Sequence, residues 1–135
     1  MAKIKLLVDT DIIIDYLKGI TLAKELFKSK NIEIYCSIIS KKERLSKAGL
    51  SNSEKEKILK LLSSLRVLKI DNTINQKYML LLGTYGERSS SLADYLIAAT
   101  AWAKGLPLLT RNTKHFKFIK EIKLAPVYES GDKTR

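Results

Sequence analysis

The feature that most constrains the fold of this chain is an apolar run near its N-terminus that stops at two acids. Residues 4–8 read Ile-Lys-Leu-Leu-Val, and Asp9-Thr10-Asp11 follows them, directly before a helical pattern. Such a run indicates a strand buried on both faces, which belongs to a parallel sheet because crossover helices cover both of its sides. Ligands bind beyond the carboxyl ends of such strands, where Asp9 lies. Two carboxylates that lose water there repel each other, so a hard divalent cation is a natural ligand.

Strand and helix patterns alternate along the rest of the chain. Gly19, Gly49 and Gly105 each follow a helical pattern, and Ser91 with Asp94 forms a capping box. This alternation indicates one α/β domain, a three-layer α/β/α sandwich around a mainly parallel sheet. We expect strands at residues 4–8, 32–37, 67–70, 107–109 and 123–125, and helices at 11–18, 21–29, 39–48, 54–65, 73–86 and 91–104. Further helix starts are expected at Thr21, at a Ser53–Glu56 capping box and at a Thr73–Gln76 capping box.

Composition sets the size and the compartment that we expect. With 135 residues, 45% of them hydrophobic, the chain suits one domain with a core over residues 1–128 and a polar tail over residues 129–135. No apolar run approaches the length of about 20 residues that spans a bilayer, and the N-terminus lacks the pattern of a secretory signal. The single cysteine, Cys36, indicates a buried thiol in a reducing compartment, with a catalytic thiol as the alternative. We therefore expect a cytoplasmic protein without a membrane segment.

The net charge is +11, from 25 Lys and Arg against 14 Asp and Glu. This excess suits a polyanionic partner such as nucleic acid. A lysine-rich, solvated surface explains it equally well, and both interpretations stay open because the basic residues are spread along the chain. With one His and one Cys, a structural zinc site is nearly excluded.

Three further polar residues stand out against the apolar pattern. Asp94 lies in the first turn of a helix, and as a lone feature it is best explained as part of the cap. Glu43 follows the second strand, where a surface glutamate paired with a lysine is the simpler explanation. Asn112 follows a late strand and also suits the N-cap of a short turn that contains His115. His115 is the only histidine, and its aromatic neighbours indicate a packed or capping role rather than a general base.

Topology unites these residues with Asp9. Asp9, Glu43 and Asn112 each follow a strand, so they share the carboxyl rim of a parallel sheet. Asp94 joins them if its helix starts over the same rim. Three carboxylates and one amide would then meet, and this set of oxygen ligands favours Mg²⁺ or Mn²⁺.

At these landmarks the chain resembles the PIN-domain nucleases, and most closely the VapC-type toxin ribonucleases. The resemblance is carried, in order, by residues 7–11 (Leu-Val-Asp-Thr-Asp), by Glu43, by residues 94–101 (Asp-Tyr-Leu-Ile-Ala-Ala-Thr-Ala) and by residues 105–116 (Gly-Leu-Pro-Leu-Leu-Thr-Arg-Asn-Thr-Lys-His-Phe). It spans nearly the whole chain, and the last two segments are its most specific part. It implies a PIN-like fold with an acidic quartet that binds Mg²⁺ or Mn²⁺ and cleaves RNA. The quartet falls on Asp9, Glu43, Asp94 and Asn112.

The resemblance also assigns individual roles. The metal ligands that it implies are Asp9, Glu43 and Asp94, and the supporting residues are Thr10, Asp11 and Thr110. Asn112 stands where the family often has Asp, so it offers a carbonyl oxygen without a charge. Asp11 stands where the family commonly has Asn, and its charge either compensates or caps the first helix. Arg111 and Arg88 are candidates for binding the RNA backbone, by proximity in the sequence alone.

The function implied is an Mg²⁺- or Mn²⁺-dependent endoribonuclease that acts as the toxin of a type II toxin–antitoxin pair. Its partners would be an RNA substrate, an antitoxin protein and a second copy of the chain in a homodimer. Two alternatives share the fold: a catalytically silent domain that binds RNA or protein, and a stand-alone RNA-processing nuclease. A phospho-acceptor receiver domain also places aspartates at strand ends, but the further Asp and Lys that it needs do not stand out.

An antitoxin helix would need an apolar groove, which we expect between the helices at 11–18, 21–29 and 54–65. These helices hold more apolar residues than one small core obviously needs, although core packing is the expected fate of most of them. The candidates are Ile13, Leu17, Leu26, Phe27, Leu61 and Leu62.

Overall fold

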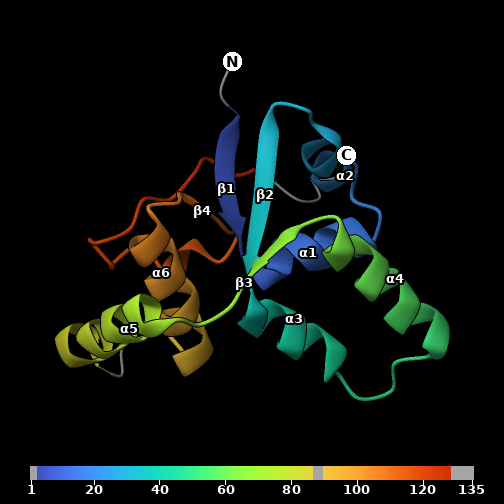
Figure 1. Ribbon diagram of the computed structural model, residues 1–135. Helices are drawn as coiled ribbons and strands as arrows, with labels where there is room; N and C mark the ends of the chain where they lie inside the picture. Colours follow the sequence, from blue (N-terminus) through green and yellow to red (C-terminus); the bar gives the residue numbers. More distant parts are fainter. Residues whose placement is uncertain (1–2, 87–89, 129–135) are drawn as a thin grey trace.

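A parallel four-stranded sheet lies at the centre of the computed structural model, which describes residues 3–86 and 90–128 (Figure 1). Its order is β3-β2-β1-β4, and each pairing of neighbouring strands is parallel. The strands are β1 (Ile4–Val8), β2 (Ile32–Ser37), β3 (Arg66–Leu68) and β4 (Leu108–Leu109). The strand expected at residues 123–125 is reduced to a single bridge, in which Leu124 pairs with Leu108.

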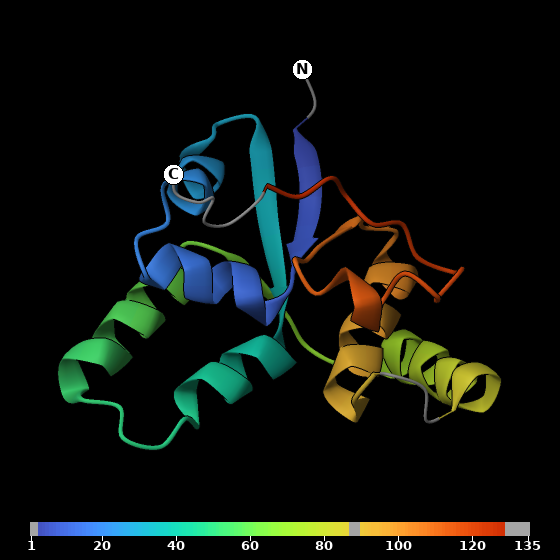
Figure 2. The same ribbon diagram turned by 180° about the vertical axis from the view of Figure 1, so that it is seen from behind.

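Helices cover both faces of this sheet, as Figures 1 and 2 show from opposite sides. The helices are α1 (Thr10–Leu17), α2 (Thr21–Lys28), α3 (Ile38–Leu45), α4 (Asn52–Ser63), α5 (Asn72–Tyr85) and α6 (Leu92–Lys104), followed by a 3₁₀ turn, η1 (Thr113–His115). α5 and α6 lie on one face, and α1, α2 and α4 lie on the other. The predicted three-layer α/β/α architecture is confirmed.

Side-chain alternation along β1 explains why the layers form. Leu7 packs into the core shared with α5 and α6, whereas Leu6 and Val8 pack into the core shared with α1 and α4. In the neighbouring β4, Leu108 and Leu109 divide between the two cores in the same way. Successive side chains of a strand point to opposite faces, so a strand covered on both faces must be apolar throughout.

Several helix starts differ from those expected. α2 begins at Thr21, but Ile20 is its N-cap and no side chain caps it. The capping box of α4 joins Ser51 to Glu54. The prediction of Ser53 with Glu56 was therefore wrong, because it chose the overlapping serine–glutamate pair two residues later. α5 is capped by Asp71, so the Thr73–Gln76 box was also wrong. Each observed N-cap lies within two residues of the predicted one, because several neighbouring residues there are able to cap the helix.

The chain reverses its direction of travel across the sheet at β1. It moves outward from β1 through β2 to β3 and then returns to place β4 on the other side of β1. Crevices that bind ligands form at such reversals, beyond the carboxyl ends of the two strands. Asp9 directly follows β1 and Thr110 directly follows β4, so this topology brings these two strand ends together.

Two composition-based expectations meet the structure here. Within residues 3–86 and 90–128, none of the helices combines the length and the apolar character needed to cross a membrane. Cys36 is fully buried in β2, and burial raises the pKa of its thiol to about 12. A buried thiol that stays protonated fits the expected core residue better than the catalytic alternative. The predicted tail at residues 129–135 lies outside the described residues.

Candidate active site

A cleft of about 470 Å³ opens beyond the carboxyl ends of β1 and β4. It collects all four residues of the predicted quartet, from four segments that are far apart in the sequence. They arrive from the end of β1, from α3, from the first turn of α6 and from the loop after β4. The lining residues are Asp9, Thr10, Asp11, Ile14, Glu43, Arg44, Ser91, Asp94, Asn112 and His115.

Asp9 is the most enclosed acid of the cleft, with 5% of its surface exposed. It is the N-cap of α1, because its Oδ1 accepts a hydrogen bond of 2.7 Å from the backbone N–H of Thr10. Its Oδ2 accepts one of 2.8 Å from the hydroxyl of Thr110. Burial, followed by the charge of Asp11, raises the pKa of Asp9 to about 6. Both causes disfavour a negative charge, so a cation in the cleft would stabilise this carboxylate.

Glu43 reaches the cleft from α3. Its Oε1 lies 3.0 Å from the hydroxyl oxygen of Thr10, which also lies 2.9 Å from the hydroxyl oxygen of Ser40. Thr10 has one hydroxyl hydrogen, so it can donate to only one of these oxygens at a time. Thr10 therefore connects the start of α1 to α3, which fits the supporting role that the family resemblance implied.

Asp94 combines a capping role with a place in the cleft. Ser91 and Asp94 form the predicted capping box at the start of α6, with hydrogen bonds of 3.1 and 3.2 Å. The Oδ2 atom of Asp94 also lies 3.1 Å from Nδ1 of His115 in η1. The start of α6 thus lies over the common rim, as the convergence argument required, and His115 contacts the third acid.

The Thr110–Asn112 segment is bonded to the start of α1 through the Thr110 hydroxyl and the Arg111 backbone, and its Arg111 side chain is bonded to Asp15 farther along the helix. The Thr110 hydroxyl donates to Asp9 and accepts a hydrogen bond of 3.0 Å from the backbone N–H of Asn112. The backbone N–H of Arg111 donates to Oδ2 of Asp11, at 2.9 Å. Asp11 Oδ1 is buried and has no hydrogen-bond partner among the described residues, and burial raises the pKa of Asp11. Asp9, not Asp11, is the N-cap of α1, so Asp11 retains an oxygen for another ligand.

Neither of the two arginines proposed for RNA binding is among the described residues that line the cleft, in contrast to the acids. The guanidinium of Arg111 is bonded to Asp15 rather than directed into the cleft. Arg88 lies outside the described residues. Arg44 lines the cleft instead, and its Nε is buried without a hydrogen-bond partner in the part of the chain that the structure describes. Its position directly after Glu43 was the only sequence signal for it.

The oxygen donors of the cleft suit a hard divalent cation. Asp9, Glu43 and Asp94 supply carboxylates, and Asn112 supplies an amide carbonyl. Asp11 supplies a buried oxygen that has no hydrogen-bond partner in residues 3–86 and 90–128. Within residues 3–86 and 90–128, no three His, Cys, Asp or Glu side chains lie close enough together to hold an ion. The donors therefore line the same cleft, but in this structure they do not surround one common ion position.

Comparison with known proteins agrees with this arrangement. Residues 6–121 match the PIN domain family. The chain is 31% identical to Ribonuclease VapC10 of Mycobacterium tuberculosis over 122 residues, which cover 87% of this chain and 90% of the relative. It is 32% identical to Ribonuclease VapC1 of Methanocaldococcus jannaschii over 127 residues, or 89% of this chain and 85% of the relative. A toxin–antitoxin complex from Klebsiella pneumoniae contains a similar fold, with a TM-score of 0.72, 29% identity, and 87% and 94% of the two chains covered.

Proposed function

The chain belongs to the PIN-domain family, and from this membership we propose that it is a divalent-metal-dependent endoribonuclease, the toxin of a toxin–antitoxin pair. The observation that carries the proposal is the meeting of Asp9, Glu43, Asp94 and Asn112 in one cleft. Relatives over most of the chain's length are named ribonucleases, and a solved structure of similar fold is a toxin–antitoxin complex.

Asp9, Glu43 and Asp94 would hold the metal, which we propose to be Mg²⁺ or Mn²⁺, with Asp11 and Asn112 in support. When bound, such a cation lowers the pKa of a water ligand and offsets the charge that develops on a phosphodiester. The protein's own part is to orient these donors through the hydroxyls and the imidazole that contact them. Each contact joins a different element to α1 or α6, so the fold itself sets the spacing of the acids.

Arg44 is the residue that we propose for contact with an RNA phosphate. It replaces Arg111 in this role because it lines the cleft beside the acids. Replacing Arg44 with Ala should raise the KM for RNA and reduce the salt slope of binding by about one. Replacing the exposed Arg66 with Ala is the matched control. An Arg44→Ala variant with wild-type KM and salt slope would rule out the phosphate contact.

Metal binding can be tested apart from cleavage. Mn²⁺ or Mg²⁺ should raise the melting temperature, because an ion that binds only the folded state stabilises it. Asp94→Asn should weaken this shift. Asp71→Asn changes a helix-start acid that does not line the cleft, so it should leave the shift unchanged. The absence of any shift in the wild type would remove the metal site from the proposal.

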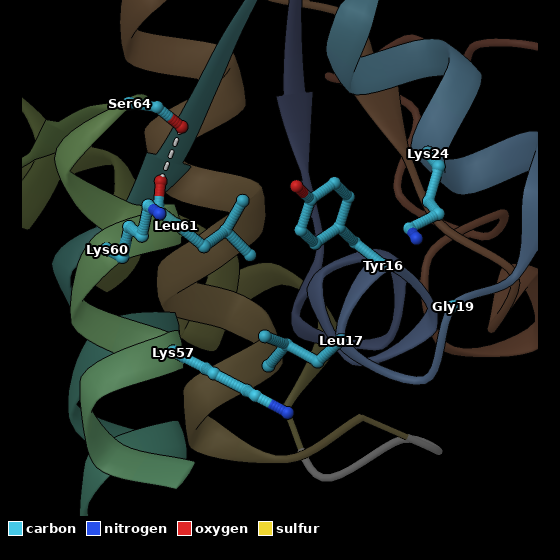
Figure 3. A pocket seen from close by; sticks show the side chains of 8 residues that line it. All are labelled: Tyr16, Leu17, Gly19, Lys24, Lys57, Lys60, Leu61 and Ser64. Atoms are coloured by element: carbon cyan, nitrogen blue, oxygen red, sulfur yellow. Dashed lines mark hydrogen bonds between the residues drawn. The ribbon is translucent and has the colours of Figure 1, made fainter. Parts of the chain in front are cut away.

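A second hollow fits the antitoxin partner. A pocket of about 410 Å³ lies between α1, α2 and α4. Figure 3 shows Leu61 of α4 facing Tyr16 and Leu17 of α1 across it, with Lys24 and Lys57 at its margins. Of the six groove residues suggested by the sequence, Leu17 and Leu61 line this pocket, and the others pack into or against the core.

The lysines define the partner segment that this pocket would accept. Apolar anchors at helical spacing would meet Leu17 and Leu61, and acidic residues beside them would meet Lys24, Lys57 and Lys60. A Lys57→Glu, Lys60→Glu double variant should lose affinity for the antitoxin encoded beside the gene. Lys55→Glu, on the same helix but outside the pocket, should retain it. Equal binding by both variants would exclude this pocket.

Expression in cells separates the toxin from the two alternatives. The wild-type chain alone should stop growth, and Asp9→Asn should relieve the arrest. Normal growth with abundant, RNA-cleaving protein would favour a stand-alone processing nuclease. The open spacing of the acids and the uncharged Asn112 favour the silent domain as the second candidate, which predicts RNA binding without cleavage at any Mn²⁺ concentration. Size-exclusion chromatography with light scattering tests the expected homodimer.

A further inference from the structure

Asp15 is a buried carboxylate that lines no part of the catalytic cleft. It lies on α1 with 3% of its surface exposed. Its Oδ2 accepts hydrogen bonds from Nε of Arg111, at 2.7 Å, and from the hydroxyl of Tyr128, at 2.9 Å. Its Oδ1 accepts a third, from Nη2 of Arg111, at 2.9 Å. An apolar cluster of similar volume often stabilises a fold as well as a buried ion pair does. Stability alone therefore does not explain the Asp15–Arg111 pair, and we consider a role in positioning.

Arg111 belongs to the loop that holds the fourth residue of the quartet. Its neighbours are Thr110, whose hydroxyl donates to Asp9, and Asn112, which lines the cleft. Its own backbone N–H donates to Asp11. Asp15 therefore holds Arg111, the middle residue of the segment from Thr110 to Asn112. Each residue of this segment contacts or lines the site.

We propose that Asp15 and Arg111 are positioning residues, which fix this segment against α1 and so set where Asp9, Asp11 and Asn112 lie in the cleft. The inference rests on the proposed function and assigns Arg111 an internal role instead of a contact with RNA. Tyr128 adds a third element to this network, because its hydroxyl donates a hydrogen bond to the same carboxylate of Asp15.

The chemistry of the pair explains why it can hold a position. Two parallel N–H···O bonds between a guanidinium and a carboxylate fix both the separation and the plane of the two groups. Lysine carries the same charge but has a single nitrogen on a flexible stem, so it keeps the attraction and loses the geometry. A displacement of about 1 Å at a reacting group can lower a rate by about 100-fold.

The molecule contains a matched control for this test. Arg66, Glu33 and Tyr35 repeat the same three groups at the edge of the sheet. Arg66 Nε donates to Oε2 of Glu33 at 2.8 Å, and the Tyr35 hydroxyl donates to Oε1 at 2.8 Å. None of these residues lines the catalytic cleft, so Arg66→Lys makes the same change of side chain without touching the site.

The test compares Arg111→Lys with Arg66→Lys. Arg111→Lys should lower kcat about 10- to 100-fold, change KM less than about twofold and weaken Mn²⁺ binding measured by calorimetry. Arg66→Lys should match the wild type in all three. A raised KM with unchanged kcat, together with a salt slope reduced by about one, would make Arg111 a phosphate contact and overturn the proposal. Wild-type values of kcat and Mn²⁺ affinity in Arg111→Lys would overturn it as well.

Two further measurements keep the inference separate from the proposed function and from folding. If the wild type neither cleaves RNA nor binds Mn²⁺, the proposed function fails. Hydrogen exchange at the backbone amides of Arg111 and Asn112 then judges the inference, because faster exchange is expected in Arg111→Lys than in Arg66→Lys. Equal exchange refutes it. If Arg111→Lys does not fold, Tyr128→Phe removes one donor to Asp15 and should accelerate the same two amides, and unchanged exchange there refutes the inference.

Discussion

The same three chemical groups occur in two regions of this molecule. Arg111 and Tyr128 donate to Asp15, and Arg66 and Tyr35 donate to Glu33. In the first set 4% of the carboxylate side chain and 33% of the arginine side chain are exposed, whereas in the second set the values are 21% and 66%.

The difference teaches that burial, connectivity and the paired bonds of Arg111, and not the chemical groups alone, decide what such a set can do. The exposed set joins the adjacent strands β2 and β3, where water competes for every group. The buried set joins α1 to a loop and to a segment more than 90 residues away in the sequence. Of the two sets, only the buried one has the residues of the proposed active site as its neighbours.

The sharpest contrast is expected in catalysis. Asp9→Asn should lower RNA cleavage about 1000-fold, because it removes a proposed metal ligand and the charge that this ligand supplies. RNA binding should be as tight as in the wild type or tighter, since a negative charge is lost from the cleft. Glu33→Gln makes the equivalent change in the exposed set and should leave cleavage intact. An Asp9→Asn variant that cuts normally would place the chemistry elsewhere.

The cleft beside the buried set and the exposed set should respond to pH with opposite signs. Asp9 has a pKa raised to about 6 from 3.8 in the metal-free protein, so the stability that its protonated form contributes is complete below about pH 4 and is lost as pH rises through 6. Without divalent ions, the stability of Asp9→Asn relative to the wild type should therefore rise by about 2 kcal/mol between pH 4 and pH 8.

Glu33 behaves in the reverse sense. The hydrogen bond from Tyr35 and the charge of Arg66 lower the pKa of Glu33 below its ordinary value of 4.5. Its contribution is present above that pH and is lost as pH falls. Chemical denaturation of Asp9→Asn, Glu33→Gln and the wild type in a chelator measures both trends. A difference between Asp9→Asn and wild type that does not vary with pH would contradict the first.

Removing the arginine should affect folding stability in one region only. Arg111→Met leaves the buried carboxylate of Asp15 without its counter-ion, and we expect a loss of about 2 kcal/mol. This is below the usual range for a fully buried pair, because Arg111 is a third exposed and water can partly replace it. Arg66→Met should change the midpoint of urea unfolding very little. Equal losses in the two variants would erase the distinction between the regions.

The smallest contrast lies in the tyrosines. Burial and the bond to Asp15 raise the pKa of Tyr128, which keeps its hydroxyl protonated as a donor. Tyr128→Phe should cost about 1 kcal/mol, the typical net value of one hydrogen bond. Tyr35→Phe should be close to neutral, because water replaces the lost donor. Urea unfolding of the two variants at pH 7 provides the measurement, and a larger loss in Tyr35→Phe would reverse the ranking.

Local patterns predicted much of the fold and the placement of the acids. The apolar run before Asp9, the Ser91–Asp94 capping box and the stop at Gly105 each depend on a few consecutive residues, and all three agree with the structure. The capping box of α4 was misplaced because Ser51 and Ser53 both have a glutamate three residues later. Such a choice depends on where the preceding loop leaves the chain, which a local pattern does not contain.

The direction of the Arg111 side chain could not be predicted from the sequence. Proximity to Asn112 suggested a cleft residue, yet its partners are Asp15 and, through the backbone, Asp11. Both partners are about 100 residues away in the chain. Once three-dimensional neighbours are known, Arg44 becomes the better candidate for contact with RNA. The convergence of the quartet was predictable only because a parallel sheet places all its carboxyl ends on one rim.

The short helix α1 has one end at the cleft and the other at the pocket between α1, α2 and α4. Eight residues of helix span about 12 Å, and α1 has Asp9 as the cap at its start and Leu17 as its last residue. If a displacement at one end of this two-turn helix moves its other end, binding at the cleft and binding at the pocket are coupled. Thermodynamic reciprocity then links the two sites: the factor by which a protein in the pocket changes the affinity for Mn²⁺ equals the factor by which Mn²⁺ changes the affinity for that protein. Titrating each in the presence of the other measures this single coupling constant twice.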